Sequence, residues 1–334
     1  MILALLLVVV FAVSLGVTWG LRRYALSRSL MDIPNERSAH SVPTPRGGGV
    51  SIVVAFLLAL PVLTLLDSLP SNVLIALSGA GVLIAVIGFV DDHGHIAARW
   101  RLMGHFVAAA WVLFWLNGLA LIELLGLSLK LGWVGGVLAA IYLVWMLNLY
   151  NFMDGIDGLA SAEAMSVCLG MCLIYLISGV AGLIWAPLVL SAGVAGFLCW
   201  NYPPARIFMG DAGSGFLGII LGTLALHAAW SKAEFLWSWL ILLGVFIVDA
   251  TWTLVRRLIC GDKVFQAHSS HAYQKAARRW GHKKVTVSVV VINVVFLLPV
   301  SVLVALDHLS VMTGICVAYA PLVCVAYLLK AGKA

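Results

Sequence analysis

Long apolar stretches alternate with short polar segments along the whole chain. A helix needs about 20 mainly apolar residues to cross a bilayer. Eleven stretches of about this length lie approximately at residues 1–20, 47–66, 72–90, 102–118, 134–150, 159–178, 183–200, 213–230, 236–255, 285–306 and 310–329. The pattern predicts an all-α, polytopic integral membrane protein with about eleven transmembrane helices, ten being the alternative count, in a single membrane-embedded domain over residues 1–334.

The composition supports the same class of protein. Hydrophobic residues make up 63% of the chain, and its mean hydropathy is +1.08, well above the values of ordinary soluble domains. The first apolar stretch has no Lys or Arg before it and is followed by Arg22 and Arg23. This flank predicts a retained anchor whose N-terminus lies outside, rather than a cleaved signal peptide.

The Lys and Arg residues are distributed unequally between the two sides that this topology defines. With the N-terminus outside, 18 of the 20 fall on the cytoplasmic side, and only Lys130 and Lys232 fall outside, as the positive-inside rule requires. The cytoplasmic segments are then residues 21–46, 91–101, 151–158, 201–212, 256–284 and the C-terminus. Contact with anionic membrane lipids explains the net charge of +6, and no interleaved aromatic and basic residues indicate a nucleic acid partner.

The acidic residues of the cytoplasmic side stand at the ends of apolar stretches. Asp91 and Asp92 end the third stretch, where two adjacent carboxylates require a neighbouring cation or a raised pKa on one of them. Asp154 and Asp157 are three residues apart, so a helix that begins there carries both on one face of its first turn. A solvated helix end is the alternative explanation of the first pair, and helix capping that of the second.

Other oxygen donors near these carboxylates favour a hard metal ion. Asn151 lies three residues before Asp154 and supplies a neutral oxygen. Asp211 opens the eighth stretch, where free backbone amides at a helix start attract phosphate and the carboxylate can hold a cation against it. Oxygen ligands without closely spaced Cys or His predict magnesium or manganese rather than zinc. Gly218 and Gly222, further along this stretch, are spaced for helix packing.

The last cytoplasmic segment contains His268 and His271 in the sequence HSSH, followed by a cluster of Lys and Arg. These side chains suit a diphosphate or a nucleotide, an ordinary basic loop facing the membrane being the alternative. Asp249 lies deep in the ninth stretch, where an unpartnered charge is costly. Arg256 or Arg257, about two helical turns further on, is our candidate for its indirect stabilisation.

Taken together, these motifs resemble those of the polyprenyl-phosphate N-acetylhexosamine-1-phosphate transferases, the membrane enzymes that start bacterial cell-envelope glycans on a lipid carrier. The resemblance covers most of the chain and includes the order of the motifs. It rests on PNERSAH and PTPRGGG in the first loop, Asp91-Asp92 after GFV, NFMDGIDGLA, FMGDAGSGFLG, the stretch from Asp249 to Arg257, and the His-containing last loop.

The resemblance implies that a sugar 1-phosphate is transferred from a UDP-N-acetylhexosamine to undecaprenyl phosphate, with release of UMP. It implies magnesium as the cofactor, with manganese as a substitute. It also implies an active site on the cytoplasmic face of the bacterial inner membrane. A homodimer is possible in such a family. The catalytic residues would be Asp91, Asp92, Asp154 and Asp157, and the metal ligands Asn151 and Asp211. Asp91 is the candidate base, metal placement being its alternative role. Substrate would be bound by Arg46, Arg256, Arg257, His268 and His271.

The chain departs from the family pattern at two places. HSSH stands where many relatives have denser His, and Ser38 stands where relatives often have Lys. These differences resemble the branch that initiates O-antigen in lipopolysaccharide synthesis from smaller donors, such as N-acetylglucosamine or 6-deoxy-N-acetylhexosamine. The alternatives are the peptidoglycan-precursor phospho-MurNAc-pentapeptide transferase and, less favoured, a nucleotide-sugar transporter, whose site would lie near the midplane of the membrane.

Overall fold

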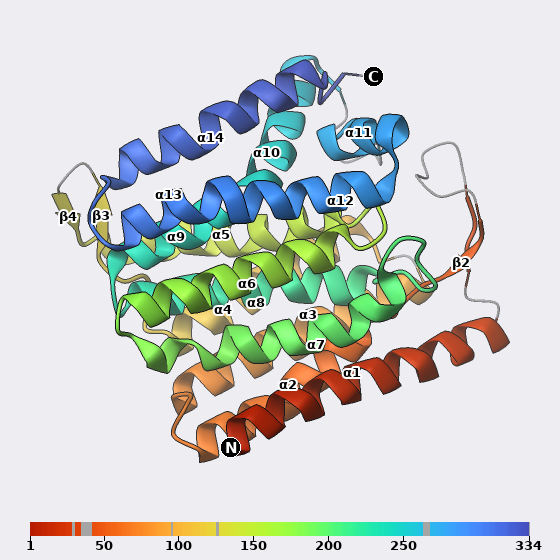
Figure 1. The fold of residues 1–334 in the computed structure, drawn as a ribbon, viewed down its shortest axis with the longest axis horizontal. Helices are drawn as coiled ribbons and strands as arrows, with labels where there is room; N and C mark the ends of the chain where they lie inside the picture. Colours follow the sequence, from red (N-terminus) through yellow and green to blue (C-terminus); the bar gives the residue numbers. More distant parts are fainter. Residues whose placement is uncertain (29–30, 35–41, 95, 125–126, 263–267, 334) are drawn as a thin grey trace.

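Long helices that lie roughly side by side make up almost the whole molecule in the computed structural model (Figure 1). The structure describes residues 1–28, 31–34, 42–94, 96–124, 127–262 and 268–333. The helices are α1 Ile2–Ser27, α2 Val50–Leu65, α3 Ser71–His93, α4 Ala98–Trp115, α5 Gly132–Met153, α6 Leu159–Ile177, α7 Trp185–Asn201, α8 Asp211–Ala229, α9 Ala233–Leu242, α10 Gly244–Ile259, α11 Ala272–Trp280, α12 His282–Val291, α13 Leu298–Ala305 and α14 Val311–Leu328. The predicted all-α class is therefore confirmed.

The remaining elements are short. A 3-10 turn, η1 Ala181–Leu183, precedes α7, and a π-helical turn, η2 Ile292–Leu297, joins α12 to α13. Two antiparallel hairpins pair β1 Met31–Asp32 with β2 Thr44–Pro45, and β3 Ile122–Leu124 with β4 Leu127–Leu129. The first hairpin agrees with the extended first loop that its prolines predicted. Ser38 lies outside the described residues.

All eleven expected spans coincide with helical segments, but fewer helices meet the requirements for crossing a membrane. Within the described residues, eight are long and apolar enough, or nine if α9 and α10 form one broken span. α2 has only 16 residues, and Arg99 and Arg101 near the start of α4 lower its hydropathy. The ninth expected span is not a continuous helix, because α9 and α10 meet at Leu243 with a bend of 70°.

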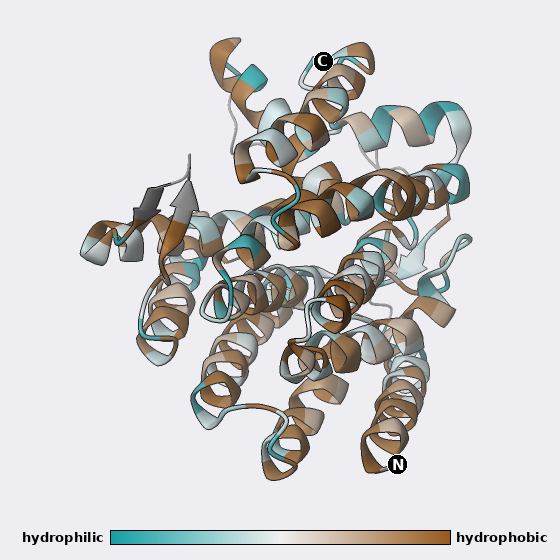
Figure 2. Ribbon diagram, turned by 60° about the vertical axis from the view of Figure 1, so that its left-hand side comes forward, coloured by the Kyte–Doolittle hydropathy of each residue, from teal (hydrophilic) through white to brown (hydrophobic). Residues whose placement is uncertain are grey.

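The outer surface of the bundle is apolar, as a multi-pass membrane protein requires. Figure 2 shows apolar residues along the lengths of the helices and hydrophilic residues mainly in the turns and at helix ends. Leu5, Phe114, Ile141 and Val295 are among the exposed large hydrophobic side chains. In water such a surface would be costly, whereas in a bilayer it faces lipid tails.

Helix α8 is the centre of the bundle, with almost its whole length buried. A Cβ atom on Gly218 would come within 2.6 Å of Leu147 Cα in α5, and one on Gly222 within 3.0 Å of Leu143 Cδ2. These two glycines therefore let α5 and α8 approach closely, which confirms the packing role that their spacing predicted. The close packing fixes the start of α8 relative to the end of α5.

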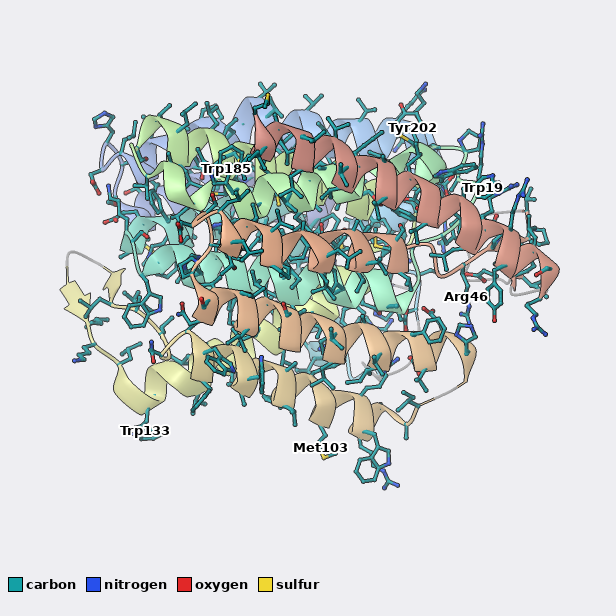
Figure 3. All side chains as sticks on the ribbon, turned by 90° about the horizontal axis from the view of Figure 1, so that it is seen from below. Trp19, Arg46, Met103, Trp133, Trp185 and Tyr202 are labelled. Carbon is teal, nitrogen blue, oxygen red and sulfur yellow. The ribbon has the colours of Figure 1, made fainter. Side chains whose placement is uncertain are left out.

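The polar segments that we assigned to one side of the membrane meet at one end of the bundle. Figure 3 shows Trp19, Arg46 and Tyr202 at this end and Trp133 at the opposite end. Lys232 also lies at the opposite end, where its Nζ is 2.5 Å from the Asp307 carboxylate. Helix α1 begins at that end, beside the end of α2, whereas α14 finishes near α11. The chain termini thus lie at opposite ends of the bundle.

Candidate active site

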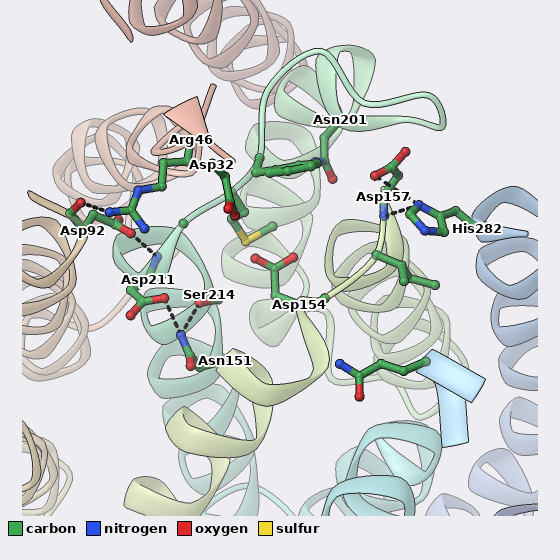
Figure 4. Close-up of a pocket in the computed structure, with 16 residues that line it drawn as sticks. Asp32, Arg46, Asp92, Asn151, Asp154, Asp157, Asn201, Asp211, Ser214 and His282 are labelled. Carbon is green, nitrogen blue, oxygen red and sulfur yellow. Dashed lines mark hydrogen bonds and ion pairs between the residues drawn. The ribbon is translucent and has the colours of Figure 1, made fainter. Parts of the chain in front are cut away.

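A pocket of about 230 Å³ lies at the polar end of the bundle (Figure 4). We call it the carboxylate pocket. Six of the residues that the sequence predicted for the site line it: Arg46, Asp92, Asn151, Asp154, Asp157 and Asp211. They come from the first loop, the ends of α3 and α5, the α5–α6 turn and the start of α8, so the fold gathers residues that are far apart in sequence.

Asn151 and Asp211 face each other across the two closely packed helices. The Asn151 Nδ2 group donates hydrogen bonds to Asp211 Oδ1 at 2.9 Å and to Ser214 Oγ at 3.0 Å. In this arrangement the amide presents N–H groups, rather than its oxygen, to Asp211. A cation held between Asn151 and Asp211 requires the amide to rotate by half a turn, which exchanges nitrogen and oxygen with little change in shape.

Asp154 points into the middle of the carboxylate pocket (Figure 4). Its carboxylate makes no hydrogen bond or ion pair with any described residue. Burial, together with the nearby carboxylates of Asp211, Asp92 and Asp157, raises the pKa of Asp154 well above its usual value. A cation in the pocket would reverse this pKa shift, so the cluster of carboxylates favours the binding of a cation.

The donor set fits a hard divalent cation, because it consists of carboxylates and an amide. Within the described residues, however, no three His, Cys, Asp or Glu side chains are grouped closely enough to form a ready-made metal site. The side chains would have to rearrange around the ion, as the orientation of Asn151 also indicates. The types of ligand thus fit a divalent cation, whereas their present positions do not yet enclose one.

The prediction that Asp154 and Asp157 share the first turn of a helix is wrong. Helix α5 ends at Met153 and α6 begins only at Leu159, so both aspartates lie in the intervening turn. Gly158 adopts a left-handed φ of 72° immediately before α6, a conformation that glycine adopts without strain. The turn directs Asp154 and Asp157 to different parts of the pocket.

Asp157 contacts the start of α12 instead. Its Oδ1 lies 3.2 Å from His282 Nδ1, and its Oδ2 accepts a hydrogen bond from the backbone N–H of Ala205 at 3.0 Å. Thr286 in α12 donates to the backbone carbonyl of Asp157. These contacts fix the outer wall of the pocket, where Asp157 and His282 lie side by side (Figure 4).

Asp92 is bound to the start of α8. Its carboxylate, with the residue only 7% exposed, accepts hydrogen bonds from the backbone N–H groups of Asp211 at 3.2 Å and Ala212 at 3.3 Å. We expected these amides to be free for phosphate, and that expectation is wrong because a carboxylate from α3 already occupies them. Arg46 donates to the backbone carbonyl of Asp92 and thereby brings a positive charge to the pocket.

Asp91 lies outside the carboxylate pocket and pairs with Arg101 of α4. Its Oδ1 also accepts a hydrogen bond from the backbone N–H of Ile96 at 2.9 Å. Arg101 in turn lies 3.8 Å from Asp211 Oδ2. Arg101 is therefore the cation that the two adjacent carboxylates were expected to require.

Asp249 has the same kind of partner as Asp92. Its buried carboxylate accepts hydrogen bonds from the backbone N–H groups of Ala272 at 2.9 Å and Tyr273 at 2.8 Å, the first two residues of α11. Thr253 Oγ1 donates to it at 3.1 Å, and His271 Nδ1 lies at 3.3 Å. The start of α11 thus supplies the direct donors to this carboxylate. Indirect stabilisation by Arg256 or Arg257 stays a prediction.

A second, much larger cavity of about 1040 Å³ lies beside the carboxylate pocket. We call it the apolar groove, since its walls are mostly apolar residues of α4, α5 and α10, including Phe106, Trp145 and Leu254. Its polar lining residues are Arg99, Arg101, His105, Asn148, Asn151, Thr251, His268 and His271. Asn151 lines both cavities, so they meet at this residue.

His268 and His271 lie on the wall of the apolar groove and not in the carboxylate pocket. Their rings stack at 5.0 Å between centroids. Burial, with smaller contributions from His271 and Arg257, lowers the pKa of His268 to about 4. His268 is therefore uncharged at neutral pH and offers hydrogen bonds rather than a positive charge.

Arg256 and Arg257 line neither cavity, although we predicted both as substrate-binding residues. Arg256 Nη1 donates instead to the backbone carbonyl of Ala331 at 3.1 Å. Conversely, the structure adds site residues that we did not single out: Arg101, His105, Asn148, Ser214, Gln274 and His282. Only Ser214 had a signal in the sequence, since it follows Asp211 by one turn in FMGDAGSG.

Comparison with known proteins shows the family of this chain. The family model "Glycosyl transferase family 4" matches residues 74–229, which extend from α3 to α8. A probable undecaprenyl-phosphate N-acetylglucosaminyl 1-phosphate transferase of Bacillus subtilis is 30% identical over 80% of this chain and 76% of its own length. The chain belongs to the polyprenyl-phosphate hexosamine-1-phosphate transferase family.

Relatives from different branches of this family match the chain almost equally well. The phospho-N-acetylmuramoyl-pentapeptide-transferase of Moorella thermoacetica is 32% identical over 68% of this chain and 74% of its own length. The decaprenyl-phosphate N-acetylglucosaminephosphotransferase of Mycolicibacterium smegmatis is 30% identical over 77% of this chain and 71% of its own length. The resemblance seen in the motifs is confirmed, while overall identity does not separate the branches.

The contacts of Asp249 generate a testable prediction. Asp249→Ala leaves the amides of Ala272 and Tyr273 without acceptors, which costs about 1–3 kcal/mol for each buried donor. We expect α11 to detach, so that trypsin cleaves at Lys275 and Arg278 at least several times faster than in the unchanged protein. Asp262→Ala is the control, because it removes an exposed carboxylate close to α10. Equal cleavage rates in the two variants would contradict the assigned role of Asp249.

Proposed function

We propose that this protein transfers an N-acetylhexosamine 1-phosphate from a UDP-sugar to undecaprenyl phosphate, giving undecaprenyl-diphosphate-sugar and UMP. The observation that carries the proposal is the meeting of the carboxylate pocket and the apolar groove at Asn151. A polar pocket suits a nucleotide, and an apolar groove suits a prenyl chain. Their junction brings a phosphate of each substrate to one place. The family's named transferases support the same reaction class.

The apolar groove is the proposed site of the lipid acceptor. Each buried CH₂ group of a prenyl chain contributes about 0.8 kcal/mol, so the chain is held by Phe106, Trp145, Leu254 and their neighbours. Its phosphate then lies at the polar end of the groove near Arg101. Asp91 holds Arg101 through their ion pair, so in this proposal Asp91 positions the phosphate-binding cation. An acceptor phosphate is already largely ionised at neutral pH, and Asp91 is not needed as a base.

The carboxylate pocket is the proposed site of the uridine diphosphate group. Arg46 offers a positive charge there, and Asn151, Asp154 and Asp211 would hold magnesium, or manganese in its place. When bound, the metal would offset the repulsion between substrate phosphates and stabilise departing UMP. The transferred sugar 1-phosphate would lie at the junction, next to His268 and His271 on the wall of the groove. Positioning and electrostatic stabilisation then account for catalysis.

The proposed sugar is N-acetylglucosamine or a 6-deoxy-N-acetylhexosamine. The proposed pathway is the synthesis of O-antigen or of another cell-envelope glycan. The HSSH sequence supports this choice over the peptidoglycan-precursor donor. The position of the site supports an enzyme over a transporter, because Arg46, which lines the pocket, lies at one end of the bundle rather than halfway along it (Figure 3).

The direct test is to incubate the purified protein with undecaprenyl phosphate, magnesium and a panel of UDP-sugars, and to measure UMP. We expect UMP only when both the lipid phosphate and an N-acetylated UDP-sugar are present. UDP-MurNAc-pentapeptide should give no more UMP than a reaction without lipid. Absence of UMP with every member of the panel, from protein shown to be folded, would contradict the proposal.

Metal dependence follows from the carboxylates of the pocket. Chelation should abolish UMP release, and added magnesium or manganese should restore it. Asp211→Asn should lose most activity, since it removes a charged oxygen from the proposed metal site while preserving the shape of the side chain. Asn151→Ala should show a smaller loss, because it removes a neutral ligand. Full activity in a folded Asp211→Asn enzyme would exclude Asp211 as a metal ligand.

The proposed place of the sugar 1-phosphate, at the junction next to His268 and His271, predicts that these residues affect the use of the donor. His268→Ala or His271→Ala should reduce kcat/KM for the UDP-sugar about tenfold to hundredfold, as expected when a hydrogen bond to a charged group is lost. The KM for the lipid phosphate should change much less. The test is to measure the kinetic constants for both substrates in detergent with each variant. His308→Ala, at the opposite end of the bundle, is the control. Unchanged donor kinetics in both variants would remove the histidines from the donor site.

A cytoplasmic location of the site follows from the distribution of Lys and Arg. Single cysteines placed next to Lys130 and Lys232 should react with an impermeant thiol reagent added to intact cells. A cysteine at Ser269 should react only after the cells are opened. Labelling of Ser269→Cys from outside would reverse the proposed orientation.

A further inference from the structure

The residues that follow α14 fold back onto the segment that carries the two histidines. We call Leu329–Lys333 the C-terminal turn. The backbone N–H of Gly332 donates a hydrogen bond to the backbone carbonyl of Ser270 at 2.8 Å. Arg256 Nη1 in α10 donates to the carbonyl of Ala331 at 3.1 Å. The turn is thus bonded to both α10 and the HSSH segment.

A lysine of α11 forms the third connection. Lys275 Nζ donates to the backbone carbonyls of Lys330 at 3.1 Å and Lys333 at 2.7 Å. Ala331 is completely buried and packs with Ala272, the first residue of α11, and Ala326 of α14. Polar and apolar contacts therefore hold the turn at one defined position.

Gly332 allows this close approach. It has a φ of +76°, and a Cβ atom added to it would lie 3.0 Å from both the carbonyl oxygen of Thr253 and Arg256 Cβ. A β-branched residue at this position would be strained by its backbone conformation and would press against α10. The position therefore requires glycine for two independent reasons.

The segment that the C-terminal turn contacts reaches both cavities of the site. Ser270 Oγ lies 3.0 Å from His268 Nδ1, so the residue bonded to Gly332 also orients His268. His271 stacks on His268, and Gln274 in the first turn of α11 lines the carboxylate pocket. Asp249 holds the start of α11 from inside the bundle, while the C-terminal turn supports the same segment from outside.

We propose that the C-terminal turn is a positioning element of the active site, which holds the segment from His268 to Gln274 in the orientation that binds the sugar nucleotide. The kinetic part of this inference rests on the proposed function. None of the residues of the turn lines the carboxylate pocket or the apolar groove. They act through the hydrogen bonds and packing described above.

The test uses two changes to the turn and two matched controls. Gly332→Val prevents the close approach, and Gly179→Val is its control, since Gly179 has a φ of +73° with open space around it. Lys275→Met removes the two bonds from Lys275 Nζ, whereas Lys275→Arg retains a cationic donor. Hydrogen–deuterium exchange over residues 268–277 is measured first, and kinetic constants for UDP-sugar and lipid phosphate are then measured on the same samples.

We expect exchange over residues 268–277 to rise about tenfold in Gly332→Val and Lys275→Met, the factor that corresponds to a lost hydrogen bond. Exchange in α8 should be unchanged, since the described hydrogen bonds of the turn go to α10, α11 and Ser270. In the same variants kcat/KM for the UDP-sugar should fall about tenfold, with little change in KM for the lipid. Gly179→Val and Lys275→Arg should resemble the unchanged protein in both measurements.

Unchanged exchange over residues 268–277 in both folded variants would overturn the inference. Faster exchange with unchanged donor kinetics would also overturn it, since the turn would then be structural only. Absence of turnover by the unchanged protein with every UDP-sugar would count against the proposed function instead. The exchange measurement would still show whether the turn holds the segment.

Discussion

The polar end of the bundle depends on two buried carboxylates, each bound to the first backbone amides of a helix other than its own. Asp92 of α3 binds the start of α8, and Asp249 of α10 binds the start of α11. A buried carboxylate is costly without donors, and the first amides of a helix lack acceptors. Each contact satisfies both requirements, and the positive end of the helix dipole adds to the attraction. Through these contacts α8 presents Asp211 at a fixed position, and the start of α11 does the same for Gln274 and for His271, the residue before this helix.

The need of backbone groups for hydrogen-bond partners also explains which features of the fold could be predicted from the sequence and which could not. All eleven expected spans are helical, because lipid leaves the backbone few alternatives to a helix. The break at Leu243 was missed, since the residues on both sides of it are apolar and periodicity does not change there. The partners of Asp92 and Asp249 were missed because backbone amides carry no residue signature. Asp92 and Ala212 are 120 positions apart, and only the packed bundle brings them together.

Some site residues could likewise be predicted from sequence motifs, whereas others became evident only in the structure. Arg46, Asp92, Asn151, Asp154, Asp157 and Asp211 meet in one pocket as their motifs predicted. His268 and His271 line the neighbouring groove, whereas Arg256 holds the C-terminal turn. Arg101 and His282 stand among many basic or interfacial residues in the sequence, where nothing distinguishes them. A family resemblance thus located the centre of the site, while the division between pocket and groove required the three-dimensional arrangement.

In the proposed reaction a sugar 1-phosphate passes from the carboxylate pocket to a lipid phosphate at the junction near Asn151. The most direct test follows the phosphorus atoms of a UDP-N-acetylhexosamine that is labelled in its β-phosphate. After incubation with undecaprenyl phosphate and magnesium, we expect the label to move to the lipid product and the released UMP to carry none. Label that remained in UDP would show transfer of the sugar alone, and label released as inorganic phosphate would show hydrolysis. Either result would contradict the proposed transfer of a sugar 1-phosphate.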